Sequence, residues 1–325
     1  MRFLKNFMIR LNKNKKLIKL VTHDGSFHAD DIFACATLSL MLEKKGEPFT
    51  IIRTRDQEII DNGEYVFDVG GTYDAELNRF DHHQKGGAGA RPASPSSPRV
   101  EAGQGGEGIS YAAFGLVWKK FGEELCGSKK ASDMIDQKLV ASIDAHDNGY
   151  DLVENKHEIS PYSIQHFFYS MRPTWQEENV TDDEMFLKCV EIAKEVLFRE
   201  IIQAKDGVLA EDLVLSIYKN TKDKRIIVLD KHYPFEYILN NFSEPLFVVC
   251  PSRNIKNKWG VRAVREDPKT FKNRKSFPVS WGGLRNEELV KVTGVQDAVF
   301  CHNNLFLAVA KSKEGAIKLA ELALL

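Results

Sequence analysis

Residues 17–31 read LIKLVTHDGSFHADD, and this stretch decides the predicted fold. The apolar run over 19–22 predicts a buried β-strand, and residues 22–31 contain two histidines and three aspartates but no lysine or arginine. Residues 30–45 then have apolar side chains at helical spacing, with acidic residues in the first turn and lysines in the last, which matches the helix dipole. A strand, a polar loop and a helix in this order are typical of ligand-binding crevices in open α/β sheets.

Strands and helices continue to alternate along the chain. Further strands are predicted over 50–54, 65–69 and 79–83, and helices over 109–122, 131–145 and 184–203. Asp206-Gly207 is a candidate linker, and after it we expect strands over 213–218, 225–229, 245–250, 259–264, 298–302 and 305–310 and a helix over 313–324. The predicted fold class is α/β: a mainly parallel sheet flanked by helices, with a second, smaller α/β domain.

Composition places the chain among globular proteins. Of its 325 residues 43% are apolar, and 45 basic side chains nearly balance 46 acidic ones, so the overall charge indicates no polyanionic partner. No apolar run reaches the ~20 residues of a membrane span. Five scattered cysteines without a CxxC pair favour a reducing compartment over a disulfide framework. We therefore expect a soluble, cytoplasmic protein without a membrane partner, and the composition leaves a homo-oligomer open.

Two segments have alternative interpretations. The first twenty residues hold seven basic side chains and no acidic one, so they are either a basic tail or an organellar transit peptide, which would change the expected compartment. Residues 86–108 are rich in glycine, proline and serine and predict a surface loop. Because this loop directly follows the sequence DHH, it is either a lid over a site or a solvated insertion.

Acidic and imidazole side chains form four clusters in the first half of the chain. The clusters are His23, His28, Asp30 and Asp31; Asp68; Asp81, His82 and His83; and Asp144, His146 and Asp147. Each follows or ends an apolar segment, and the carboxyl ends of parallel strands meet at one crevice, so we expect the clusters to converge. One such aspartate alone would more often be a helix or turn cap, but four clusters together predict a centre for two divalent cations.

The order of these clusters resembles that of the DHH phosphoesterase superfamily. Within it, the segments THDGSFHADDIFACATL, IIRTRD, VFDVGGTYD, RFDHHQ, YAAFGLVWKKFG and DAHDNG are similar to those of the MYG1 family of metal-dependent, exonuclease-like proteins. The similarity continues through RPTW, WGVRAV and WGGLRNEEL to FCHNNLFLAVAKSKEGA. It implies a basic tail over 1–18, a DHH-like metal-binding catalytic domain over 19–205 and a C-terminal substrate-binding α/β domain over 206–325.

The resemblance also implies a set of site residues. Carried over by position, the metal ligands are His23, His28, Asp30, Asp68, His82 and Asp144. Most superfamily members have an aspartate where His28 stands, Asp147 competes with Asp144 for the last role, and His146 is treated as a neutral position. Mn²⁺ is the expected cation, with Mg²⁺ and Zn²⁺ as alternatives.

Roles for these residues follow from their charge. Asp68 is expected to bridge two cations about 3.5–4 Å apart, with Asp144 as a second candidate bridge. The two cations would share a water of lowered pKa, and the resulting hydroxide would attack phosphorus. Asp81 would orient an imidazole, and one histidine of the pair His82 and His83 would bind metal while the other reaches the substrate. The expected catalytic residues are thus Asp68, Asp81, His82 and His83.

The second predicted domain contains candidate substrate contacts. Residues 253–275 hold nine basic and two acidic side chains, with aromatic residues interleaved, which indicates either a groove for single-stranded nucleic acid or a solvated basic surface. Gly282 and Gly283 allow a phosphate to approach the backbone closely, or form a structural turn, and Arg285 can bind a phosphate with two hydrogen bonds. The resemblance supports Arg285 and His302 as substrate contacts.

Three functions are compatible with this pattern. The first is a divalent-metal-dependent phosphodiesterase, a 3′→5′ exonuclease that acts on RNA or short single strands and releases nucleoside 5′-monophosphates; the preference for RNA is what the family implies. The second is a hydrolase of small phosphoanhydrides, such as a pyrophosphatase or nucleotide phosphatase. The third is a non-catalytic binding protein that a metal stabilises. The four clusters favour an enzyme, and the basic stretch favours a polymeric substrate.

Overall fold

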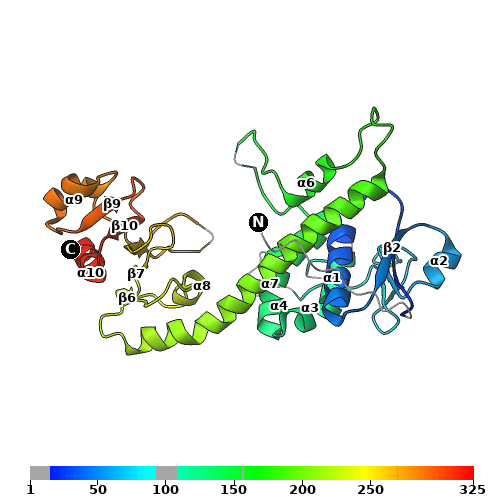
Figure 1. Cartoon of the computed structure of the whole chain (residues 1–325), viewed down its shortest axis with the longest axis horizontal. Coiled ribbons are helices and arrows are strands. Elements are labelled where there is room, and N and C mark those ends of the chain that lie inside the picture. Colours follow the sequence, from blue (N-terminus) through cyan, green and yellow to red (C-terminus); the bar gives the residue numbers. More distant parts are fainter. Residues whose placement is uncertain (1–14, 93–107, 156, 269) are drawn as a thin grey trace. The chain divides into compact units, whose positions relative to one another are not determined.

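The computed structural model describes residues 15–92, 108–155, 157–268 and 270–325 (Figure 1). The chain forms two compact units, Met1–Lys205 and Asp206–Leu325. Most of the predicted basic tail over 1–18 and of the predicted loop over 86–108 lies outside the described residues. The functions predicted for the two domains stay predictions.

The first unit contains a five-stranded sheet in the order β2-β1-β3-β5-β4. Its strands are β1 (Ile18–Thr22), β2 (Phe49–Arg53), β3 (Tyr65–Phe67), β4 (Tyr73–Asp74) and β5 (Arg79–Phe80). Strand β1 pairs in parallel with β2 and β3, and β3 pairs in parallel with β5, whereas β4 runs antiparallel to β5. The predicted mainly parallel sheet is confirmed, and the carboxyl ends of β1, β3 and β5 therefore lie at one edge.

Helices flank this sheet. They are α1 (Ala29–Lys45), α2 (Gln57–Asp61), α3 (Ala113–Cys126), α4 (Lys129–Ile135), α5 (Ala141–Asp147), α6 (Ile164–Ser170) and the first part of α7 (Asp182–Asn220). A π-helical segment, Asp136–Val140, joins α4 to α5. Helices α1 and α3 pack against each other (Figure 1). The fully buried rings of Phe33 and Phe114 stack between them with centroids 5.1 Å apart. The predicted helix over 131–145 is therefore three consecutive helical segments.

Two predictions fail in helix α7. The strand expected over 213–218 is helical, and the linker expected at Asp206-Gly207 lies inside the same continuous helix, although the boundary between the two units falls there. The run LVLSIY is apolar enough for a strand, but Val214 and Tyr218 are four residues apart and both are buried against the core of the second unit. Burial of one helical face thus overrides the local β-propensity.

The second unit contains a smaller α/β arrangement. Its sheet has the order β6-β7-β8-β10-β9, with strands β6 (Ile226–Val228), β7 (Phe247–Pro251), β8 (Trp259–Ala263), β9 (Ala298–Cys301) and β10 (Leu307–Ala310). Strands β6 and β7 are parallel, and the other pairs are antiparallel. The remaining elements are α8 (Glu236–Leu239), the 3₁₀ turn Val279–Trp281, α9 (Asn286–Thr293) and α10 (Lys313–Leu324). The predicted second α/β sheet and closing helix are confirmed.

Candidate metal centre

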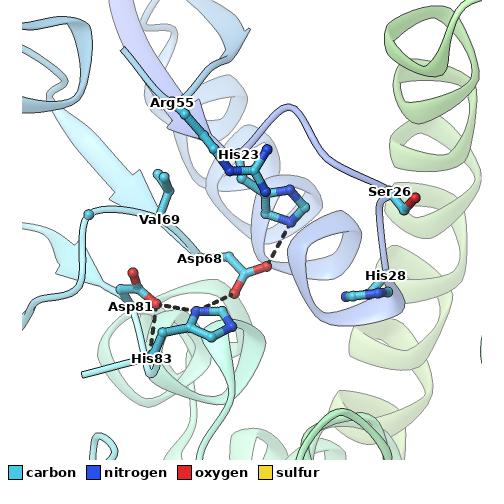
Figure 2. Close-up of a pocket in the computed structure, with 9 residues that line it drawn as sticks. His23, Ser26, His28, Arg55, Asp68, Val69, Asp81 and His83 are labelled. Atoms are coloured by element: carbon cyan, nitrogen blue, oxygen red, sulfur yellow. Dashed lines mark hydrogen bonds and ion pairs between the residues drawn. The ribbon is translucent and has the colours of Figure 1, made fainter. Parts of the chain in front are cut away.

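Three strands of the first unit each end in a polar cluster, and the clusters meet. His23 follows β1 directly, Asp68 follows β3, and Asp81 begins the DHH sequence after β5. Figure 2 shows Asp68 between His23 and His83, with one carboxylate oxygen directed to each imidazole. The predicted convergence of strand ends is confirmed for these three clusters.

The turn after β3 fixes the direction of Asp68. Its φ is 54°, in the left-handed region that aspartate tolerates better than most residues. The next residues are Val69 and then Gly70 and Gly71, with φ of 96° and 66°. The backbone N–H of Gly71 donates to Asp81 Oδ2 at 2.6 Å, which ties this turn to the end of β5. Glycine is favoured at these two positions because their φ values lie in the region that side chains with a Cβ atom rarely adopt.

Asp81 supports His83 as a hydrogen-bond acceptor. Its Oδ1 accepts the backbone N–H of His83 at 3.0 Å and lies 2.7 Å from Nδ1 of the same residue. Burial would raise the pKa of Asp81, but the His83 imidazole and two backbone N–H groups outweigh burial and lower it. Both oxygens of Asp81 are thus used by its neighbours, as expected for a residue that orients an imidazole rather than binding metal.

Helix α1 begins at the fourth contributing segment. His28 is the N-cap, and Asp31 at the third helical position accepts the His28 backbone N–H at 2.9 Å in a capping box. Asp30 and Asp31 lie in the first turn, where the helix dipole stabilises negative charge. Their side chains are buried, so the capping geometry directs carboxylates inward from the helix terminus.

Three groups of donor atoms in the described residues lie close enough to share a cation. They are His23, Asp31 and Asp68; Asp68, His82 and His83; and His28, Asp30 and Asp147. Asp68 belongs to two of the groups: its Oδ2 lies 3.1 Å from His23 Nε2, and its Oδ1 lies 3.2 Å from His82 Nε2. This geometry is what a bridging carboxylate requires.

The donor spacing fits a metal centre. Two ligand atoms about 2.1 Å from one cation, at angles of 90–109°, are about 3.0–3.4 Å apart. His82 Nε2 lies 3.2 Å from Asp68 Oδ1 and 3.3 Å from Asp147 Oδ2, and His23 Nε2 lies 3.3 Å from Asp31 Oδ2. Both Asp30 carboxylate oxygens, together with Asp68 Oδ1 and His82 Nε2, are buried without a hydrogen-bond partner. Buried, unpartnered donors of this kind are costly unless a cation satisfies them.

The charges of the site are compatible with bound cations. Burial raises the pKa of Asp30 well above its usual range, and the carboxylates of Asp68 and Asp147 raise it further. Burial lowers the pKa of His23, but hydrogen bonding to Asp31 and Asp68 outweighs it and raises the pKa to about 9. Without metal, the carboxylates therefore draw protons onto Asp30 and His23, and bound dications would replace those protons.

The structure corrects the expected place of Asp144. This residue is fully buried away from the donor groups: its Oδ2 lies 2.7 Å from Arg91 Nη1, and its Oδ1 accepts the backbone N–H of Gly115 at 3.0 Å. Arg91 also contacts Asp136 through Nε and Nη2. Asp147, the last residue of α5, occupies the position near His82 that was expected for Asp144. Of these two aspartates, Asp147 belongs to the groups of donor atoms in the described residues and Asp144 does not.

A pocket opens beside the donor groups and contains a residue that sequence reasoning missed. Its accessible volume is about 380 Å³, and it is lined by His23, Ser26, His28, Arg55, Asp68, Val69, Gly70, Asp81 and His83 (Figure 2). Arg55 comes from the loop after β2, and its side chain is 62% exposed and pairs with exposed Asp24. An exposed pair of this kind contributes little to stability, so the guanidinium is free to exchange partners. Arg55 could have been found in the sequence as a charged residue that follows β2, a fourth parallel strand of the sheet.

Candidate substrate residues of the second unit form their own cluster. The Arg285 guanidinium lies over the Phe300 ring at 4.6 Å, and the His302 ring lies 6.1 Å from Phe300. The turn that carries Gly282 and Gly283 approaches Asn303, and Gly283 has a φ of 77°. The structure thus brings Arg285, His302 and the glycine turn close to one another within this unit.

The predicted basic stretch over 253–275 is less available than its composition suggests. Arg274 donates to backbone carbonyls at Asn240 and Pro245, and Lys275 donates to the Leu324 carbonyl. Lys272 pairs with Glu266. These contacts hold loops together, so part of the positive charge serves the fold of the second unit.

Comparison with known proteins now identifies the family. A family model described as "Uncharacterised protein family (UPF0160)", the MYG1 family, matches residues 19–324. The chain belongs to this family. MYG1 proteins at similar distances include one from Schizosaccharomyces pombe, 28% identical over 95% of this chain and 98% of its own length, and one from Chlamydia trachomatis, 30% identical over 93% and 95%.

Other MYG1 relatives carry a functional name. The protein from Bos taurus named MYG1 exonuclease is 26% identical over 94% of this chain and 84% of its own length. Among solved structures, a crystal structure of exonuclease RecJ bound to manganese aligns with 94% of this chain and 90% of its own, at 14% identity and a TM-score of 0.25. That score is too low to support any inference about this chain.

Proposed function

We propose that this MYG1-family chain is a divalent-metal-dependent phosphodiesterase, a 3′→5′ exonuclease that acts on RNA or short single strands and releases nucleoside 5′-monophosphates. The observation that carries the proposal is the set of three donor groups, joined through Asp68, beside an open pocket. Buried donors with ligand-like spacing have little structural use without cations. Membership in a family that includes proteins named exonuclease supports the choice of reaction.

The donor groups divide between two cations. His23, Asp31 and Asp68 would hold one, and Asp30, Asp68, His82 and Asp147 would hold the other, with His28 close to Asp147. Mn²⁺ suits this mixture of imidazole and carboxylate best, with Mg²⁺ and Zn²⁺ as alternatives. When bound, such cations lower the pKa of a water and neutralise charge on a phosphoryl group.

The chain's own side chains position the substrate. His83 is 62% exposed, points into the pocket and is held by Asp81, so it can donate a hydrogen bond to a phosphate or leaving oxygen (Figure 2). Arg55 supplies a guanidinium at the same pocket and can leave Asp24 for a phosphate group. Within the second unit, Arg285, His302 and the turn at Gly282-Gly283 lie close together and would form a phosphate-binding surface of their own.

A second function shares the same centre. A pocket of about 380 Å³ with polar walls also accepts pyrophosphate or a single nucleotide, so hydrolysis of small phosphoanhydrides is the alternative. We favour the exonuclease because the rings of His28 and Tyr169 lie beside the donor groups and because basic side chains are exposed in the second unit.

The five cysteines, all buried and free, fit a reducing compartment such as the cytoplasm. Among the described residues, no helix combines the length and the hydropathy that a bilayer crossing requires.

One panel of substrates tests the proposal. The full chain is incubated with Mn²⁺ and, in parallel, with RNA or DNA labelled at either end, pyrophosphate and a dinucleotide. We expect stepwise shortening of RNA from its 3′ end with release of 5′-monophosphates, and loss of the reaction in EDTA. Release of phosphate from pyrophosphate alone would support the second function, and no turnover on any substrate would leave a metal-stabilised binding protein.

A further inference from the structure

A row of rings leads away from the donor groups on the side of His28. The His28 ring lies 6.4 Å from that of His23 and 6.2 Å from that of Tyr169, edge to face. Tyr169 in turn lies 6.2 Å from His146 and 6.4 Å from His166, and Tyr162 lies 5.6 Å from His166. His28, Tyr169, His146, His166 and Tyr162 are called the ring row below.

The ring row is not part of the hydrophobic core. None of its five members is buried: the Tyr162 residue is 71% exposed, His166 is exposed, and His28, His146 and Tyr169 are partly exposed. By contrast Phe27 and Phe168, which neighbour the row in sequence, are fully buried. Five neighbouring rings that all reach solvent are available to a ligand.

The row is also held in place. Helix α6 begins with a capping box in which His166 Nδ1 accepts the Ser163 backbone N–H at 3.1 Å. The Arg172 guanidinium lies over the Tyr169 ring at 4.3 Å, and its Nε donates to the Phe27 carbonyl at 3.0 Å. Phe27 immediately precedes His28, so one arginine fixes the ring row to the loop that carries the candidate ligands. A preordered surface of this kind loses little entropy on binding.

We propose that the ring row is a subsite for the base of the terminal nucleotide, with its phosphate at the neighbouring donor groups. Every base has a π face, so stacking on aromatic side chains holds nucleotides with little regard to sequence. His28 contacts Asp147 of the donor groups at 3.7 Å and also contacts Tyr169, so a molecule at both places joins a phosphate to an aromatic ring. This inference rests on the proposed function and names the substrate class: nucleotides rather than inorganic polyphosphates.

Binding without turnover tests the subsite directly. Dissociation constants of AMP and of ribose 5-phosphate are measured by calorimetry on the full chain, with Mn²⁺ present. Both probes carry the same phosphate, so their ratio isolates the base. We expect AMP to bind at least about tenfold more tightly, within the range that base stacking on aromatic side chains provides.

Two variants remove rings and preserve the local fold. Tyr162→Leu removes the most exposed ring, and His166→Gln removes an imidazole while leaving an amide oxygen that can accept the Ser163 N–H of the capping box. Phe198→Leu is the matched control, because Phe198 is a half-exposed ring elsewhere in the first unit. Each ring-row variant should weaken AMP binding by a part of the parent's roughly tenfold preference for AMP and leave ribose 5-phosphate binding unchanged, whereas the control should change neither.

The outcomes separate this inference from the proposed function. If AMP and ribose 5-phosphate bind equally, or if both ring-row variants bind AMP as the parent does, the subsite is refuted even where RNA is degraded. If AMP binding depends on the rings but no phosphodiester in the panel is hydrolysed, the subsite stands and the exonuclease proposal fails. A melting curve of each variant in EDTA shows whether it is folded.

Discussion

Two aspartates three residues apart in α5 should respond to substitution in opposite ways. Asp144→Asn keeps the shape of the side chain and the acceptor for the Gly115 N–H but removes the charge opposite Arg91. Removing one partner of a buried ion pair costs about 3–5 kcal/mol. Because Arg91 keeps its contact with Asp136, we expect a loss in the free energy of unfolding at the lower end of this range, about 3 kcal/mol. Such a loss lowers the melting temperature of a unit of this size by about 6–12 °C.

Asp147→Asn should leave the metal-free protein as stable as the parent. Asp147 lies near the carboxylate of Asp30, so loss of its charge relieves repulsion where no cation is bound. At a Mn²⁺ concentration one hundred times the dissociation constant, the free energy of unfolding of the parent should rise by about 2.7 kcal/mol and its melting temperature by about 5–11 °C. The Asp147 variant should lose most of this gain.

Thermal unfolding followed by circular dichroism, in EDTA and in Mn²⁺, measures both effects. Asp144→Asn should melt early in both buffers and keep the Mn²⁺ increment, and Asp147→Asn should melt normally in EDTA and lose the increment. An Asp144 variant with normal stability in EDTA but no response to Mn²⁺ would show that Asp144 is the ligand and that the assignment is wrong.

Three further predictions follow from the site. Asp68→Asn keeps the left-handed backbone and should reduce turnover more than about 100-fold without unfolding the chain, because two donor groups lose the carboxylate that they share. Initial rates on RNA in Mn²⁺ measure this effect, and near-normal rates would exclude Asp68 from the metal centre. Arg55→Gln should raise KM about tenfold and change kcat little, because the exposed guanidinium helps to bind the substrate. An unchanged KM would show that Arg55 does not contact the substrate. The pKa of His23 is raised to about 9 without metal, so the stability that its protonated ring contributes below pH 6.5 is lost as the pH rises toward 9. Melting temperatures in EDTA should therefore fall between pH 6.5 and 9, while the rise in melting temperature caused by Mn²⁺ should grow. A Mn²⁺-induced rise that becomes smaller with pH would contradict the assignment of His23.

The sequence predicted the parts of the centre that depend on strand ends. His23 and Asp68 directly follow parallel strands, and His82 lies two residues after another. Parallel topology is readable from alternating strands and helices. The choice between Asp144 and Asp147 was not readable in the same way. Both lie on one side of α5, and only a displacement of about 4.5 Å along the helix axis separates them.

What decides between the two aspartates comes from distant segments. The lack of a side chain at Gly115 leaves room for the Asp144 carboxylate, and Arg91 supplies its countercharge, so Asp144 takes a structural position. The π-helical segment just before α5 also changes the helical phase, which no periodicity in the sequence reveals. The place of Arg55 after a parallel strand is a weak signal by itself, because many exposed arginines lie in such loops without lining a pocket.

The buried pair of Arg91 and Asp144 connects the segment after the DHH sequence to helix α5. Arg91 follows the DHH sequence by eight residues and is held by a bridge between Ala90 and Ser110, while Asp144 shares α5 with Asp147. At Gly115 a Cβ atom would lie 1.8 Å from Asp144 Oδ2, so only glycine lets α3 approach this point. Buried ion pairs contribute little net stability, but removing one partner is costly, and a fork such as Arg91 accepts few geometries. The two aspartates of the fourth cluster therefore have different surroundings: Asp147 lies near His82 in the donor groups, and Asp144 joins α5 to Arg91 and to Gly115 of α3.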